Sequence, residues 1–201
     1  MSPMVEHREL LRRGVRLEQA TLAWNVVGVA VLAATAIAAH SIALAAFGFD
    51  SLVEIGASAV VLWELAEKAT DRSAKALRLI GYAFVILVPY VVAVGVASLL
   101  LAGHPRHSPY GIGWTAATFV VMLVLALGKR RTGRALQNEV LIAEGRVTTI
   151  DAYLAASVLV GLALNAALGW WWADPLASLV VVFYAVQEAR HIFAGAMPTP
   201  A

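Results

Sequence analysis

The sequence contains no cysteine and few charged residues. Of its 201 residues, 14% are charged and 61% are hydrophobic. The lack of cysteine excludes disulfides, thiolate metal sites and cysteine nucleophiles. The sequence has no long polar or Gly/Ser-rich linker, phosphate-binding loop, nucleotide fingerprint, nucleophile motif or aromatic nucleic-acid platform. The chain as a whole has a mean hydropathy of +0.78, which is too apolar for a soluble domain of this size and indicates a membrane protein.

The apolar residues fall into six runs, each close to the roughly 20 residues that a helix needs to cross a bilayer. A tight His40-Ser41 turn separates the first two runs, and helical periodicity of the fifth could begin near Val140. We predict an all-α integral membrane bundle of six helices over residues 17–194, between an N-terminal segment, 1–16, and a short tail, 195–201. The predicted spans are residues 17–39, 42–63, 79–101, 112–128, 147–168 and 175–192.

The basic residues predict the orientation of this bundle. If the six spans alternate, fourteen of the fifteen Lys and Arg residues fall on the side of the two termini, and only Arg106 falls opposite. The positive-inside rule therefore predicts that both termini are cytoplasmic. Residues 1–16 carry charges interspersed with leucines, which predicts either an amphipathic segment on the inner leaflet or an extension of the first helix.

Two acidic residues, Asp50 and Glu54, lie inside the second predicted span. They are four residues apart, so on a helix their carboxylates share one face. Asp50 lies roughly 12 Å from the start of its span at 1.5 Å per residue, which is near the bilayer midplane. Acids at this depth are costly and typically mark ion or proton pathways. The alternative is a structural polar pair that hydrogen-bonds to neighbouring helices.

Asp151 is the other acid well inside a span. It would complete a site with Asp50 and Glu54 if the second and fifth spans pack together; alone, it could instead pair with Arg146 or with a basic residue on another helix. Three carboxylates suit a divalent metal, and they would bind protons when the metal is absent. We therefore expect protons and metal to compete for these residues.

In three of its segments the sequence resembles the cation diffusion facilitator family. Residues 41–63, which include Asp50 and Glu54, residues 143–170, which include Asp151, and the opening of the sixth span, residues 171–182, carry the resemblance. The family places two metal ligands four apart on the second helix and two on the fifth, around zinc or a related metal. The resemblance implies that Asp50, Glu54 and Asp151 are metal ligands, that the metal is transported cargo, and that no cofactor is needed.

The sequence departs from the family pattern at Val147, which stands at the fourth ligand position and cannot coordinate metal. Thr148 could supply a hydroxyl or hold a water there, and Glu144 aligns with an acidic position near the cytoplasmic entrance, although a solvated or Arg146-paired glutamate is an equal reading. Oxygen ligands without imidazole favour manganese or iron(II), while zinc stays a candidate. The family's cytoplasmic C-terminal domain has no counterpart in the sequence, so we expect any homodimer to form through membrane helices.

The resemblance implies a secondary transporter, not an enzyme, that exports a divalent metal in exchange for protons by alternating access, with the bacterial inner membrane as its location. The main alternative is a non-transporting bundle that serves as a structural or partner subunit, and Val147 is its best support. A membrane metallohydrolase ranks third, because no histidine lies in the interior of a span. Of the remaining residues, we expect Glu64 to belong to a solvated cytoplasmic cluster and His104 and His107 to an ordinary outer loop.

Overall fold

The computed structural model describes residues 3–66, 70–100, 108–170, 172, 186–187 and 190, and these residues are almost all helical. Its five long helices are α1 (Pro3–Ala39), α2 (Ile42–Ala66), α3 (Thr70–Leu100), α4 (Pro109–Leu136) and α5 (Glu139–Leu168). The first, second, fourth and fifth predicted spans each lie inside one of them, and the third, 79–101, lies inside α3 up to Leu100, where the described residues stop. Of the sixth predicted span, 175–192, only residues 186, 187 and 190 are described. His104, His107 and the tail 195–201 lie outside the described residues. The presence of six helices therefore stays a prediction.

Four of these helices, α1, α2, α4 and α5, are long and apolar enough to cross a membrane. Exposed large hydrophobic side chains occur along them, among them Ile37, Leu52, Val124 and Val160. Buried side chains, by contrast, include many polar and charged ones. Apolar groups outside and polar groups inside are what a helix bundle in lipid requires, since the hydrocarbon solvates only apolar atoms. The prediction of an all-α integral membrane protein is therefore confirmed.

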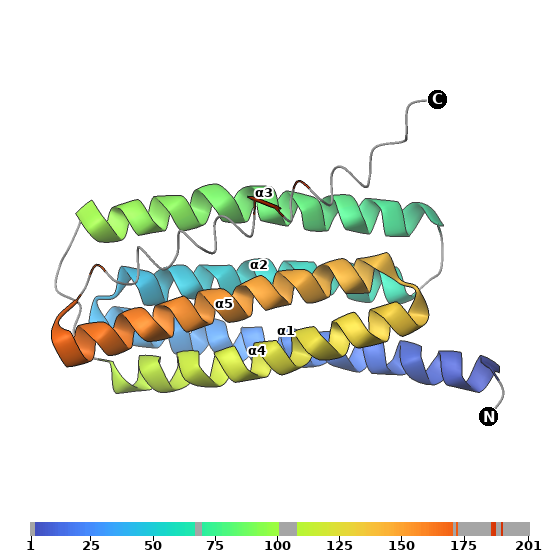
Figure 1. Ribbon diagram of the computed structural model, residues 1–201, viewed down its shortest axis with the longest axis horizontal. Coiled ribbons are helices and arrows are strands. Elements are labelled where there is room, and N and C mark those ends of the chain that lie inside the picture. The colour runs from blue at the N-terminus through green and yellow to red at the C-terminus, as the bar shows by residue number, and fades with distance from the viewer. Residues whose placement is uncertain are drawn as a thin grey trace.

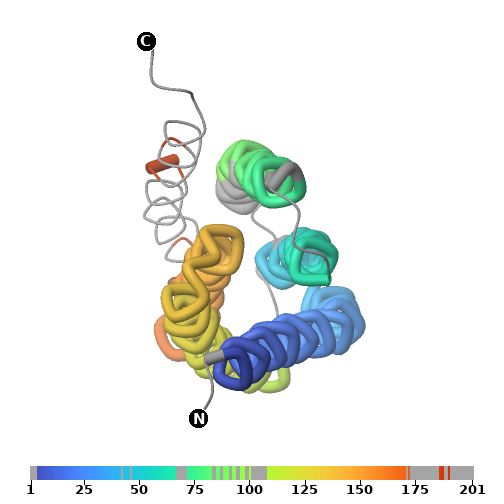
Figure 2. Tube along the Cα trace, turned by 90° about the vertical axis from the view of Figure 1, so that its right-hand side faces the viewer, coloured from blue at the N-terminus to red at the C-terminus, as the bar shows by residue number. Residues whose placement is uncertain are grey.

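The helices α1, α2, α5 and α4 form a closed ring. Each contacts the next, α1 with α2, α2 with α5, α5 with α4, and α4 with α1 (Figures 1 and 2). Helix α3 lies outside the ring and packs against α2 and α5. The ring has an interior that is shared by four helices, and the functional residues described below project into it.

Short turns with local hydrogen bonds hold this ring together. His40 takes a left-handed conformation, with φ of 52°, and ends α1, and the Ser41 hydroxyl accepts a hydrogen bond from the Leu44 amide at the start of α2. This is the predicted His40-Ser41 hairpin. Gln137, also with φ of 52°, ends α4, and the Asn138 side chain caps α5 by accepting from the Leu141 amide at 2.8 Å. Two residues thus suffice to reverse the chain at each turn.

Residues 3–16 continue α1 without interruption, so the N-terminal segment extends the first helix. At 37 residues and 1.5 Å per residue, α1 is about 55 Å long, which exceeds the roughly 30 Å hydrocarbon thickness. Figure 1 shows its N-terminal end projecting past the rest of the bundle, at the same end as the α4–α5 turn.

Candidate functional site

Asp50 of α2 and Asp151 of α5 face each other inside the ring. Their exposed fractions are 4% and 5%, and their carboxyl groups lie close enough to interact with each other. The Oδ2 atom of each is buried and has no hydrogen-bond partner in the described part of the chain. The second and fifth predicted spans do pack together, and this contact brings the two acids to one place.

Glu54 lies one turn further along α2 and is 2% exposed. Neither of its carboxylate oxygens has a hydrogen-bond partner that meets normal geometry among the described residues. The Thr148 hydroxyl is close to it, and the charges of Asp50, Glu144 and Lys129 act on it. A buried carboxylate with both oxygens unsatisfied is costly, because the lost hydration is replaced by nothing.

Polar contacts continue along the whole α2–α5 interface. The Ser58 hydroxyl donates to Glu144 Oε1 at 3.5 Å, and Asn138 Nδ2 donates to Glu64 Oε2 at 3.0 Å. Residue numbers rise along α2 as they fall along α5, which is the register of two antiparallel helices. We call this row the polar seam. It consists of Asp50, Glu54, Ser58 and Glu64 of α2 with Glu144, Thr148 and Asp151 of α5 and its N-cap residue Asn138.

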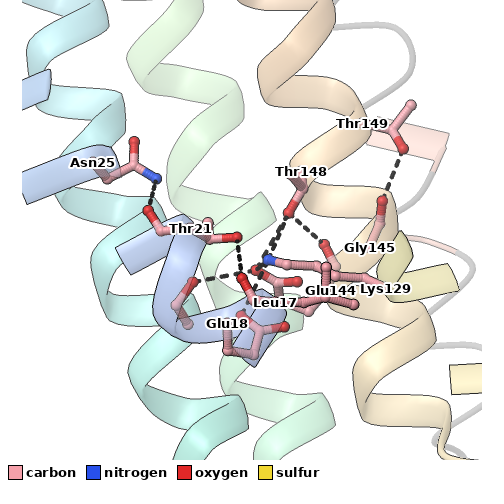
Figure 3. Close-up of polar contacts among 10 residues, drawn as sticks. Leu17, Glu18, Thr21, Asn25, Lys129, Glu144, Gly145, Thr148 and Thr149 are labelled. Atoms are coloured by element: carbon pink, nitrogen blue, oxygen red, sulfur yellow. Dashed lines mark hydrogen bonds and ion pairs between the residues drawn. The ribbon is translucent and has the colours of Figure 1, made fainter. Parts of the chain in front are cut away.

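A buried lysine meets the seam from the opposite side of the ring. Lys129 of α4 has an exposed fraction of 0%, and its Nζ atom forms ion pairs with Glu144 Oε1 and, at 3.1 Å, with Glu18 Oε2 of α1. Nζ also donates to the Thr148 hydroxyl at 3.1 Å. Figure 3 shows the Lys129 side chain running between α1 and α5 to reach these oxygens. We call Lys129, Glu18, Glu144 and Thr148 the Lys129 cluster.

Both Lys129 and Glu144 lie on helices, α4 beyond the end of the fourth predicted span and α5 from a start close to the Val140 that periodicity allows. Helix α4 runs to Leu136 and α5 begins at Glu139, so both residues are helical, and both are fully buried. A solvated Glu144 is therefore excluded. The signal that could have found the pair is Asn138, a good N-cap followed directly by helical periodicity, because a two-residue turn folds Lys129 back beside Glu144.

Glu18 gave no usable signal in the sequence. It lies at the start of the first predicted span, among the charges of the N-terminal segment, where a solvated glutamate is the ordinary expectation. Its burial depends on α4 placing Lys129 opposite, and the two residues are far apart in the chain. A contact between residues so far apart in the chain depends on the packing of α1 against α4. The stacked rings of Trp24 and Trp114, with centroids 4.9 Å apart, help to fix this packing.

Glu64 also differs from the expectation of a solvated cytoplasmic cluster. It is 6% exposed and accepts hydrogen bonds from the Ser73 hydroxyl, at 2.7 Å, and from Asn138. It thereby joins the end of α2 to the first turns of α3 and to the α4–α5 turn. The other expected members of that cluster are Glu67 and Lys68, which lie outside the described residues, and Asp71, whose side chain the structure does not describe.

The described residues do not form a ready metal site. No group of three or more His, Asp or Glu side chains lies close enough together in this part of the chain to hold a metal ion. Val147, at the fourth ligand position, is 6% exposed and belongs to the hydrophobic core. Thr148 is engaged by Lys129 and Glu144. Metal binding by Asp50, Glu54 and Asp151 would therefore need Glu54 to move toward the aspartate pair.

Comparison with known proteins places this bundle in a family. A sequence model of the cation efflux transmembrane domain matches residues 19–198. The chain belongs to the cation efflux family. The match covers all of the ring helices except the start of α1, so the resemblance to cation diffusion facilitators that the second and fifth spans indicate is confirmed.

One curated relative in the cation efflux family is the cation-efflux pump FieF of Shewanella oneidensis, with 30% identity over 111 residues. The aligned region is 55% of this chain but only 36% of the relative. The chain thus spans about a third of the length of that pump.

Proposed function

We propose that this chain exports a divalent metal cation, either zinc, manganese or iron(II), in exchange for protons by alternating access. In this proposal the bundle has six helices, both termini face the cytoplasm, and the protein resides in a bacterial inner membrane. The proposal rests on one observation above all: among the residues that the structure describes, and besides Glu64 at the end of α2, five carboxylates and a single lysine are buried within the ring. They are Glu18, Asp50, Glu54, Glu144, Asp151 and Lys129.

The excess of negative charge is the physical argument for a cation pathway. Lys129 offsets one of the five carboxylates, and the others cannot all stay ionised in a low-dielectric interior without further positive charge. Two species can supply it: protons, which neutralise the acids one by one, and a divalent cation, which offsets two at once. Each species displaces the other, and this competition is what proton-coupled metal exchange requires.

In the proposal, Asp50, Glu54 and Asp151 are the metal ligands, and Thr148 and Glu144 are further candidates. The unpartnered Oδ2 atoms of the aspartates and both oxygens of Glu54 supply free lone pairs. Closure of Glu54 onto Asp50 and Asp151 would be the step that binds the cation. Carboxylate oxygens favour manganese and iron(II) over softer ions, and zinc also accepts them.

The test is metal flux into proteoliposomes under an imposed pH gradient, comparing zinc, manganese and iron(II). We expect gradient-dependent flux for the wild type and a loss of at least tenfold in Asp50→Asn, which keeps the shape of the side chain but removes its charge. Glu139→Gln is the matched control, since Glu139 is an exposed acid of α5 outside the ring, and it should transport like the wild type.

Absence of flux for every metal, with correctly folded wild type, would overturn the proposal. It would favour the non-transporting bundle, in which the buried acids serve only the packing of the helices. Buried Val147 at the fourth ligand position supports that alternative. Gel filtration of the same preparation tests whether the chain forms a homodimer through its membrane helices.

A further inference from the structure

The Lys129 ammonium is held like a bound cation. Three oxygens surround it, Glu18 Oε2, Glu144 Oε1 and Thr148 Oγ1, and they come from two different helices. Lys129 itself comes from a third helix, and its whole side chain is buried. A lysine that merely snorkels would extend its charge toward water, whereas this one extends it into the ring (Figure 3).

The oxygens of this cluster are not satisfied by the lysine alone. Glu18 Oε1 and Glu144 Oε2 are buried and have no hydrogen-bond partner within the described ranges. Two carboxylates face one ammonium, so with both carboxylates ionised the Lys129 cluster carries one negative charge in excess, which a proton or a second cation would neutralise. Such an arrangement would hold a divalent cation at least as well as it holds a lysine, because two charges would then oppose two.

The cluster adjoins the proposed metal site. The Glu54 carboxylate interacts electrostatically with both Lys129 and Glu144, and Thr148 also lies close to Glu54. The cluster is also on the side of Glu54 that faces the α4–α5 turn, since Ser58, one turn nearer to that end of α2, donates to Glu144. An ion that travels along the polar seam from that end must pass Lys129.

We infer that Lys129 is a tethered cation that occupies a second cation position in the ring, formed by Glu18, Glu144 and Thr148, and thereby limits the pathway to one free divalent ion at a time. The inference deepens the proposed function and rests on it for the existence of an ion pathway through the ring. The second cation position itself depends only on the contacts of Lys129. Lys129 is thus a charge-setting residue, not a ligand of the cargo.

The first test is the number of ions bound at equilibrium. We suggest dialysing the full chain, in lipid nanodiscs, against Mn²⁺ and measuring the bound metal. Lys129→Met, which keeps the aliphatic stem but removes the charge, should bind one more Mn²⁺ per chain than the wild type. Arg131→Met is the matched control, because Arg131 is exposed on the same helix, and it should bind the wild-type number. An unchanged number in folded Lys129→Met would overturn the inference.

A second variant keeps the inference testable if Lys129→Met does not fold. Glu18→Gln preserves the shape of the cluster and removes a carboxylate that offsets the charge of Lys129. Because Lys129 adjoins the proposed site, its less compensated charge should weaken Mn²⁺ binding there by about tenfold, as expected for a buried charge within a low-dielectric ring. Mn²⁺ affinity within twofold of the wild type would show that the cluster does not set the charge of the pathway.

A double variant separates the two proposals. In an Asp50→Asn background, Lys129→Met should still bind one more Mn²⁺ than Asp50→Asn alone, because the second position does not use Asp50. If Asp50→Asn keeps wild-type binding and flux, the proposed transport site fails, while the comparison of Lys129→Met with wild type still decides whether Lys129 stands in for a cation. If the extra ion disappears together with Asp50, the second position is not independent and the inference fails.

Discussion

The Thr148 hydroxyl contacts two of the three charged residues of the Lys129 cluster, Lys129 and Glu144. It accepts a hydrogen bond from Lys129 Nζ at 3.1 Å and donates within α5, to the Glu144 carbonyl at 3.1 Å or to its carboxylate at 3.3 Å. The hydroxyl of its neighbour Thr149 donates to the Gly145 carbonyl of the same helix, and within the described part of the chain it makes no other hydrogen bond. The two residues therefore provide the same chemistry in different surroundings.

Thr148→Val should destabilise the protein by about 1–3 kcal/mol, because it leaves a buried ammonium short of one acceptor. Thr149→Val, a change of the same size, should cost well under about 1 kcal/mol, since a hydroxyl bonded within its own helix is readily replaced there. Thermal unfolding in detergent measures both. Equal effects of the two substitutions would show that the contact of Thr148 with Lys129 contributes nothing to stability.

At the scale of the helices, α4 and α5 pack closely enough to need glycine. A methyl group added to Gly145 would lie 2.8 Å from Arg130 Cγ, 3.1 Å from the Arg130 backbone nitrogen and 3.2 Å from Lys129 Cβ. Backbone atoms cannot yield as a flexible side-chain end can. Gly145 thus sets the distance between α4 and α5 at the turn where Lys129 crosses toward Glu144.

Gly145→Ala should separate the helices and destabilise the protein by about 1–3 kcal/mol, as overpacking does. It should also weaken Mn²⁺ binding, because the cluster would be displaced. Gly113→Ala in α4 is the control: nothing lies within 4 Å of an added methyl group there, so helix propensity should make it neutral or stabilising by up to about 1 kcal/mol. A melting temperature of Gly145→Ala equal to that of the control would contradict this explanation.

The helices were largely predictable from sequence, and the polar interior only in part. Apolar runs locate the first five helices, and the spacing of Asp50 and Glu54 places them on one face, because these signals are local. The partners of Lys129 and Glu18 are not local. Whether a charged residue at the end of an apolar run meets water or a counter-charge depends on which helices adjoin, and a single sequence does not contain that information.

At the scale of the whole molecule, the two ends of the bundle can be told apart by chemistry. The His40 turn joins α1 to α2 at one end, and the Gln137 turn joins α4 to α5 at the other; both residues are exposed. Figure 1 shows the N-terminal end of α1 on the same side as the α4–α5 turn. Because the chain contains no cysteine, a single introduced cysteine gives an unambiguous label.

Gln137→Cys should react with a membrane-impermeant maleimide only from the cytoplasmic side, and His40→Cys only from the opposite side, if the termini are cytoplasmic. Labelling of right-side-out and inverted vesicles distinguishes the two. The reverse pattern would show the orientation opposite to the one that the positive-inside rule predicts. Labelling of both residues from one side would contradict the placement of the two turns on opposite sides of the membrane.

The long sequence separation of Glu18 and Lys129 has a consequence for biosynthesis. Glu18 leaves the ribosome about 110 residues before its counter-charge, which at 5–20 residues per second is a delay of roughly 5–20 s. Glu18 lies near one end of its predicted span, where it can remain hydrated during this interval; an acid at mid-depth could not. We therefore expect Glu18 to exchange water for its buried ammonium partner only after the fourth helix has been synthesised.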